Sequence, residues 1–190
     1  MSASRNKKKM PLAEQLAASL LADRTEVNLK RWAQYIIKNK IPLMDVAHVV
    51  TGGQTVATPF IWMVGGLCES APEIVAPAVG YFYSKRHDVR IINFNRSLAK
   101  MFWLAGIPKK IQGEAIDEMF KWVLDAKVIV STKNYALLAL DKLSDKHPEL
   151  KNELKIVIQD QLGKNSVAFE KCAGKIFRKL EGLHTSRENR

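Results

Sequence analysis

The sequence predicts an all-α fold, namely an α–α superhelix of about four to five stacked antiparallel helix pairs. Apolar residues recur with helical periodicity from residue 11 to residue 182, and β-branched residues nowhere alternate with polar ones for long enough to form a strand. Pro72, Pro108 and Pro148 follow one another at intervals of 36 and 40 residues, which is the spacing of helix-pair repeats. Proline is tolerated at the first position of a helix, so each of the three predicts a helix start.

Length and composition agree with one folded domain between two tails. Of the 190 residues, 47% are hydrophobic and 26% are charged, and a chain of this length can bury about 70% of the surface that it exposes when unfolded. The formal net charge is +11, and Arg5, Lys7, Lys8 and Lys9 concentrate part of it at the start of the chain. We predict a basic disordered tail over 1–10, a single helical-repeat domain over 11–182 and a flexible C-terminal tail over 183–190.

Each expected helix is bounded by proline, glycine or polar residues, and the connections are short, as antiparallel neighbours require. Leucines near the ends of four of these helices, at 67, 104, 143 and 180, repeat at intervals of 37, 39 and 37 residues and are expected to face the core. The expected helices are 11–23, 26–39, 42–51, 54–69, 72–86, 90–105, 109–125, 131–146, 149–162 and 165–182.

The last two repeats show the core pattern best. Each contains a stripe of apolar residues at helical spacing, in which small residues such as Ala136 and Ala173 let neighbouring helices approach closely. The stripes are Tyr135, Ala136, Ala139, Leu140 and Leu143 in one helix, and Phe169, Cys172, Ala173, Ile176, Phe177 and Leu180 in the other.

These motifs resemble those of HEAT and armadillo helical-repeat proteins. Asp88-Val89-Arg90 precedes an expected helix, where HEAT repeats place Asp, Val and a basic residue at the turn between paired helices. With Asn134–Leu140 and Pro148-Glu149-Leu150, the chain is similar over residues 54–182 to short bacterial HEAT-like proteins of unassigned function. Some of these are labelled adenylosuccinate lyase. The sequence does not support that label, because it lacks the mobile Ser-Ser-x-Met-Pro-x-Lys-x-Asn-Pro loop of those enzymes.

One uncharged segment is long enough to consider as a membrane span. No Asp, Glu, Lys or Arg occurs between Asp45 and Glu69, but the Gly52-Gly53 pair is expected to divide the segment into two short buried helices. We therefore expect no membrane span. Cys68 and Cys172 lie far apart on apolar stripes, which favours packing roles, a reducing compartment and a cytoplasmic protein.

The sequence contains no catalytic or metal-binding pattern that we recognise, so we expect no enzyme activity, no cofactor and no metal. The four histidines are not spaced to place two ligands on one helix face. His48 is expected in the core, Trp62 and Trp122 are expected to be core residues, and the carboxylates of Glu114, Asp117 and Glu118 are expected on a solvated face.

Basic residues on two of the expected helices are the candidate binding residues. Aligning Leu98 with Ala173 pairs Arg96 with Lys171 and Lys100 with Lys175, so the same basic pair recurs two repeats apart. In HEAT-like stacks the second helix of each pair lines the concave surface. Trp103 follows the first pair by about one turn, and it is either a packing residue or a binding residue. The candidate set is Asn93, Arg96, Lys100, Trp103, Lys171, Lys175 and Arg178.

Three classes of function remain open at this level. The favoured one is a non-catalytic scaffold that binds an acidic protein partner on a basic concave face. The alternative is a nucleic-acid-binding protein related to the HEAT-like glycosylases that repair alkylated DNA, which would need an acidic residue and an aromatic residue in the groove. No feature favours the third, a small enzyme of unknown class. The sequence does not identify the partner or the oligomeric state.

Overall fold

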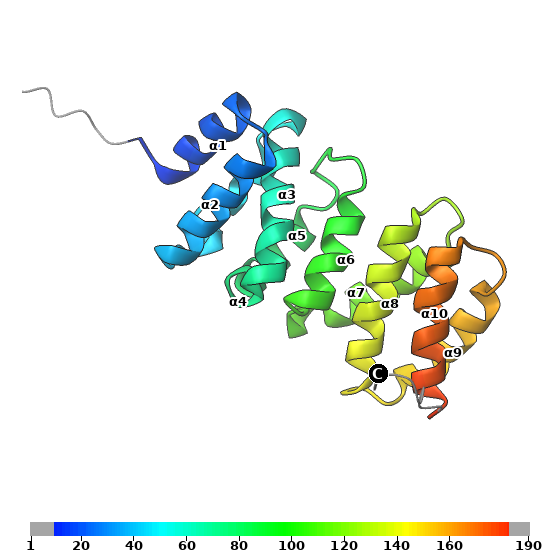
Figure 1. The fold of residues 1–190 in the computed structure, drawn as a ribbon. Helices are drawn as coiled ribbons and strands as arrows, with labels where there is room; N and C mark the ends of the chain where they lie inside the picture. Colours follow the sequence, from blue (N-terminus) through cyan, green and yellow to red (C-terminus); the bar gives the residue numbers. More distant parts are fainter. Residues whose placement is uncertain (1–9, 183–190) are drawn as a thin grey trace, which may run out of the picture.

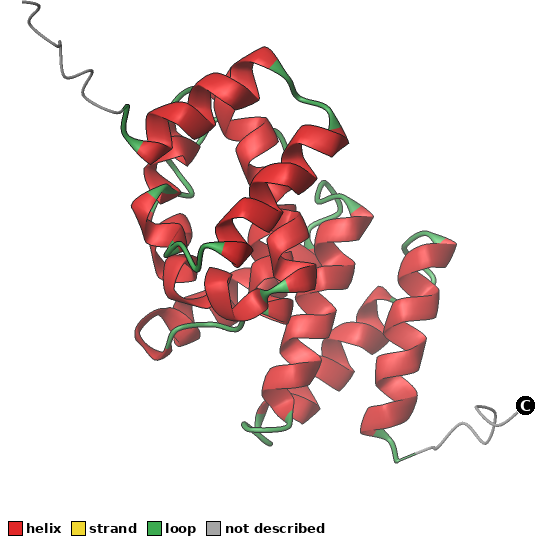
Figure 2. Ribbon diagram, turned by 60° about the vertical axis from the view of Figure 1, so that its left-hand side comes forward, coloured by secondary structure: helices red, strands yellow, loops and turns green. Residues whose placement is uncertain are grey.

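The computed structural model describes residues 10–182 and is helical throughout that range. No β-strand occurs between residues 10 and 182, and the helices are joined by short connections (Figure 2). The predicted all-α fold is confirmed. The predicted tails lie outside the described residues, apart from Met10.

The helix bounds follow the sequence pattern closely, with 3₁₀ segments (η) between several of the α-helices. The α-helices are α1 (Leu12–Ala22), α2 (Glu26–Lys38), α3 (Gln54–Ser70), α4 (Pro72–Val75), α5 (Val79–Ser84), α6 (Phe94–Leu104), α7 (Gln112–Leu124), α8 (Val130–Ser144), α9 (Leu150–Gln161) and α10 (Val167–Leu180). The 3₁₀ segments are η1 (Leu43–Asp45), η2 (Ala47–Thr51), η3 (Ala76–Ala78) and η4 (Lys109–Ile111).

Four helices lie side by side in the order in which the chain makes them. α6 packs on α3 and on α8, and α8 packs on α10 (Figure 1). We call α3, α6, α8 and α10 the first layer. Behind it, α5 packs on α6, α7 packs on α8, and α9 packs on α7, α8 and α10. α1 and α2 pack on α3 at the N-terminal end.

A continuous hydrophobic core runs between the layers. Phe60 of α3 contacts Phe82 of α5 with ring centroids 6.3 Å apart, and Phe102 of α6 stacks on Trp122 of α7 at the same distance. Leu67 is fully buried, whereas the other leucines of the repeated series, at 104, 143 and 180, are partly buried against the core. Ala136 of α8 and Ala173 of α10 are fully buried.

Two expected helices do not form continuous α-helices. The segment 42–51 forms only η1 and η2. The segment 72–86 is divided into α4, η3 and α5, with Pro77 inside η3, because proline has no N–H to donate to a continuous α-helix.

Other expectations differ from the structure in detail. α6 begins at Phe94 instead of residue 90, because Asn93 is left-handed (φ 61°) and ends the preceding loop. His48 is exposed, since the short η2 turn directs Val49 and Val50 to the core instead. No helix within residues 10–182 is both long enough and apolar enough to cross a membrane.

Candidate functional site

The sequence-predicted basic residues point away from the core on two helices of the first layer. Arg96 lies two positions before Leu98, and Lys171 lies two positions before Ala173. Two positions correspond to about 200° around a helix, and both reference residues are fully buried. Arg96 and Lys171 are therefore exposed. Three more of the predicted residues are exposed as well, namely Asn93, Lys175 and Arg178.

Lys100 differs from the other candidates because its charge is already paired. Its ammonium Nζ lies 2.7 Å from the Oε1 atom of Glu69 on α3, and its side chain is only 16% exposed. This ion pair joins α3 to α6. Sequence periodicity gave no indication of a carboxylate partner 31 residues earlier in the chain.

Trp103 is used in contacts within the protein. Its indole stacks on the ring of Tyr135 on α8, with centroids 5.7 Å apart and the planes inclined by 24°. Its backbone carbonyl accepts a hydrogen bond of 3.0 Å from Lys142 Nζ. Of the two interpretations that the sequence left open, these contacts favour packing between α6 and α8.

The acidic residues that α8 presents toward α10 are also paired. Lys179 Nζ lies 3.0 Å from Asp141 and 3.3 Å from Asp145. Among residues 10–182, no carboxylate lies within ion-pair distance of four exposed cations on α6 and α10. We call these four the basic face: Arg96, Lys171, Lys175 and Arg178.

Lys133 does not contribute to this surface, because its side chain is almost fully buried between α8 and α10. Its Nζ donates a hydrogen bond of 3.0 Å to Asn165 Oδ1 and lies 5.8 Å from the centroid of the Phe169 ring. Burial lowers the pKa of Lys133, and the nearby charge of Asp125 opposes that shift.

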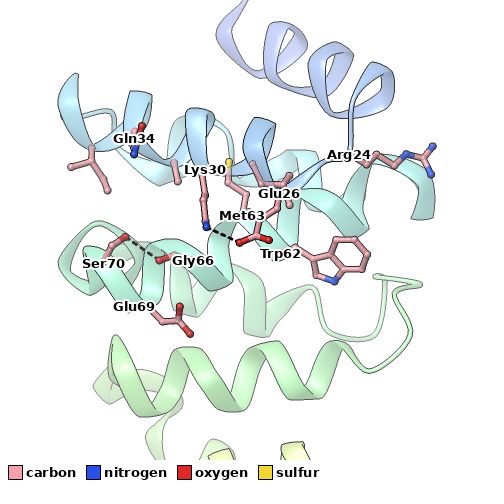
Figure 3. A pocket seen from close by; sticks show the side chains of 12 residues that line it. Arg24, Glu26, Lys30, Gln34, Trp62, Met63, Gly66, Glu69 and Ser70 are labelled. Carbon is pink, nitrogen blue, oxygen red and sulfur yellow. Dashed lines mark hydrogen bonds and ion pairs between the residues drawn. The ribbon is translucent and has the colours of Figure 1, made fainter.

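The structure shows a groove between α2 and α3 that sequence reasoning missed. Its volume is about 690 Å³. Trp62 lies in it and is 57% exposed, so the prediction of a core position for this residue is wrong. Figure 3 shows the side chains of α2 facing those of α3 across the groove. Its lining residues are Arg24, Glu26, Leu29, Lys30, Ala33, Gln34 and Ile37 from α2 and the turn before it, and Trp62, Met63, Gly66, Glu69 and Ser70 from α3.

Gly66 keeps the middle of this groove open. A Cβ atom at this position would meet no atom within 4 Å outside its own helix backbone. The sequence signal that could have found the groove is the Gly65-Gly66 pair inside a helix, since glycine there costs stability and calls for another reason.

The two carboxylates of the groove are each paired with a lysine. Glu26 Oε1 lies 2.7 Å from Lys30 Nζ, as Figure 3 shows, and Glu69 is paired with Lys100. The hydrogen bond from Lys30 holds the pKa of Glu26 below its ordinary value. Glu26 is therefore ionised at neutral pH and unsuited to donate a proton.

A second polar cluster lies between α5 and α7. Arg86 Nε is 3.1 Å from Glu118 Oε2, and the guanidinium lies 3.9 Å above the ring of Tyr83. Glu118 is only 21% exposed, so the expectation of a solvated face is wrong for this residue, although Glu114 and Asp117 are exposed. Burial, followed by the hydrogen bond to Glu118, raises the pKa of Tyr83 to about 12. The cluster joins α5 to α7.

The thiols are not activated. Burial raises the pKa of Cys68 to about 12, and burial also raises the pKa of the partly exposed Cys172, whereas a nucleophilic cysteine needs a lowered pKa. Across the part of the chain that the structure describes, no group of His, Cys, Asp and Glu side chains is arranged to hold a metal ion.

Comparison of the chain with models of known protein families, with curated proteins and with solved structures finds no match.

Proposed function

We propose that this protein is a non-catalytic binding module, a HEAT-like stack whose basic face binds an acidic protein partner. The observation that carries the proposal is the charge of that face. Arg96, Lys171, Lys175 and Arg178 are exposed without an ion-pair partner among residues 10–182, while the neighbouring carboxylates of Glu69, Asp141 and Asp145 are paired with lysines.

The order of the helices supports the HEAT-like part of this proposal. In the first layer, α6, α8 and α10 each follow a helix of the second layer, namely α5, α7 and α9. Helix-pair repeats stack in this way and present one layer as an extended surface for partners. The position of the basic face on the first layer supports its assignment as the surface that binds the partner.

The energetics of exposed charges support a role in binding. Exposed cations contribute little to folding stability, but they raise the association rate and select partners of opposite charge. A surface that keeps four cations unpaired is therefore suited to attracting a carboxylate-rich protein.

The test replaces the four residues of the basic face by Ala and measures binding to poly-glutamate, an acidic polypeptide, by fluorescence anisotropy. We expect affinity to fall by about tenfold or more, because each lost contact between charges costs roughly 1 kcal/mol or more in an interface. The matched control removes the same number of charges from exposed positions of the second layer and its connections, namely Lys109, Lys110, Lys121 and Lys127. Equal losses in the two variants would show that only net charge matters, and the proposal would fail.

A specific observation favours nucleic acid as a second candidate. The groove is lined by an exposed aromatic residue, Trp62, and by Arg24, which has no ion-pair partner among residues 10–182, and nucleic-acid bases stack on such side chains next to charges that bind phosphate. The paired state of Glu26 and Glu69 favours binding over base-excision chemistry.

Single-stranded DNA is the probe for the second candidate. Single-stranded DNA binding would weaken with salt by roughly 0.7 logarithmic units per phosphate contact. Deletion of residues 1–10 is the control, since Arg5, Lys7, Lys8 and Lys9 carry four of the positive charges. Nucleic acid would be the partner if DNA binding survives this deletion, is tighter than poly-glutamate binding and is lost in the basic-face variant. In that case the proposal of an acidic protein partner would be abandoned.

A further inference from the structure

We infer that the groove between α2 and α3 binds the apolar stripe of an acidic amphipathic helix in the partner protein. This inference rests on the proposed function and adds a second contact site to it. The groove supplies apolar anchoring, while the basic face supplies attraction between charges.

The length of the groove favours a helix as its occupant. On the α2 side its helical lining runs from Glu26 to Ile37, a span of about 17 Å at 1.5 Å per residue. Recognition of an amphipathic helix uses a trough of this kind, which accepts side chains at successive turns.

The walls and floor of the groove suit apolar side chains. Leu29, Ala33 and Ile37 line it from α2, and Trp62 and Met63 line it from α3. With no side chain at Gly66 and open space above it, a large side chain of the partner can reach the helix backbone there. An exposed tryptophan beside such a space is the kind of residue on which binding energy concentrates in interfaces.

The charges around the groove favour an acidic occupant. Glu26 and Glu69 are each neutralised by a lysine at 2.7 Å. Arg24 remains at one end of the lining with no carboxylate partner among the described residues, so Arg24, Lys30 and Lys100 outnumber the two carboxylates by one. The net charge along the groove is therefore positive. The chain's own basic first residues carry the same sign and do not complement it.

The experiment measures the binding of three labelled peptides of about 18 residues, long enough to form a helix in water. The first carries a stripe of Leu with Glu elsewhere, the second replaces Leu by Ala, and the third replaces Glu by Lys. We expect the Leu and Glu peptide to bind the full-length protein about tenfold or more tightly than either of the others.

Two variants of the full chain fill or flatten the groove. Gly66→Leu places a side chain in the open space, and Trp62→Ala removes the exposed indole; each should weaken binding of the Leu and Glu peptide by about tenfold or more. Gly113→Leu is the matched control, because Gly113 is also an exposed glycine inside a helix with open space around its Cβ position. Circular dichroism and the denaturant midpoint verify that each variant is folded, and Trp62→Ala provides the test if Gly66→Leu is not.

The outcomes separate this inference from the proposed function. If the Leu and Ala peptides bind equally, and only the basic-face variant loses them, the groove is not the anchor site while the proposed function stands. Failure of every acidic peptide and of poly-glutamate overturns both. Three other outcomes would assign the groove to another occupant and overturn the inference. The Lys peptide could bind more tightly than the Leu and Glu peptide, or Gly66→Leu could dissociate a dimer of the protein. Alternatively, Gly66→Leu could weaken the binding of single-stranded DNA without affecting the peptides.

Discussion

Leu140 is fully buried in α8, in the layer that also contains α6 and α10. Replacing it by Ala removes apolar contacts and leaves a cavity that the surrounding helices only partly close. We expect Leu140→Ala to reduce the free energy of unfolding by roughly 2–5 kcal/mol, measured by urea denaturation. A midpoint equal to that of the unchanged protein would mean that this side chain is not in the core.

Lys133 gives the fold a dependence on pH. Its folded-state pKa is lowered, mainly by burial, so the unfolded chain holds this proton up to a higher pH than the folded one does. Between the lowered value and the ordinary lysine value near 10, stability therefore rises with pH. The burial penalty on the charged form is present below that window and disappears above it.

Substitution isolates this effect. We expect the difference in free energy of unfolding between Lys133→Met and the unchanged protein to favour the variant most at neutral pH and to decline as pH approaches about 10. Urea denaturation at several pH values measures this difference. The exposed Lys127→Met variant gives the baseline. A difference between Lys133→Met and the unchanged protein that stays constant over this pH range would contradict the assignment.

At the scale of the element, the glycine at position 66 lowers the stability of α3 and leaves the groove open. Gly66 is helical, and its Cβ position is unobstructed, so Gly66→Ala should raise the free energy of unfolding by roughly 0.5–1 kcal/mol. Thermal or urea denaturation measures the gain, and Gly113→Ala provides a comparison in another helix. A loss of stability would show that another group requires close approach to Gly66.

The bounds of most helices could be predicted from sequence because capping, proline and apolar periodicity are local signals. The break in 72–86 and the late start of α6 after Asn93 could not be predicted. A single proline or left-handed residue ends a helix in some tertiary settings and only bends it in others. The exposure of Arg96 and Lys171 was predictable from their spacing to buried residues. The pairing of Lys100 with Glu69 and the α2–α3 groove depend on how separate helices are placed, which periodicity does not encode.

At the scale of the whole molecule, the stacked order predicts a gradient of local stability. α6 and α8 have neighbours on both sides in the first layer, whereas α10 packs on α8 and α9 at one end and α1 packs on α2, α3 and η2 at the other. In a stacked array each unit is stabilised by its neighbours, so end helices open more easily. We expect amide hydrogen exchange to be slowest in α6 and α8 and fastest in α1 and α10. Uniform protection along the chain would instead indicate a single cooperative unit.

The side-by-side order of α3, α6, α8 and α10 also bears on how the chain reaches its native state. Each of these helices meets the next helix of the layer through residues 31 to 39 positions apart in sequence, and because the entropic cost of loop closure grows only slowly with loop length, each closure adds a similar moderate cost. Chains dominated by such local contacts fold rapidly, commonly within microseconds to milliseconds. During synthesis, α3 and α6 can therefore begin to pack before α10 has left the ribosome. Little of the apolar surface of these helices stays exposed until the end of the chain is made.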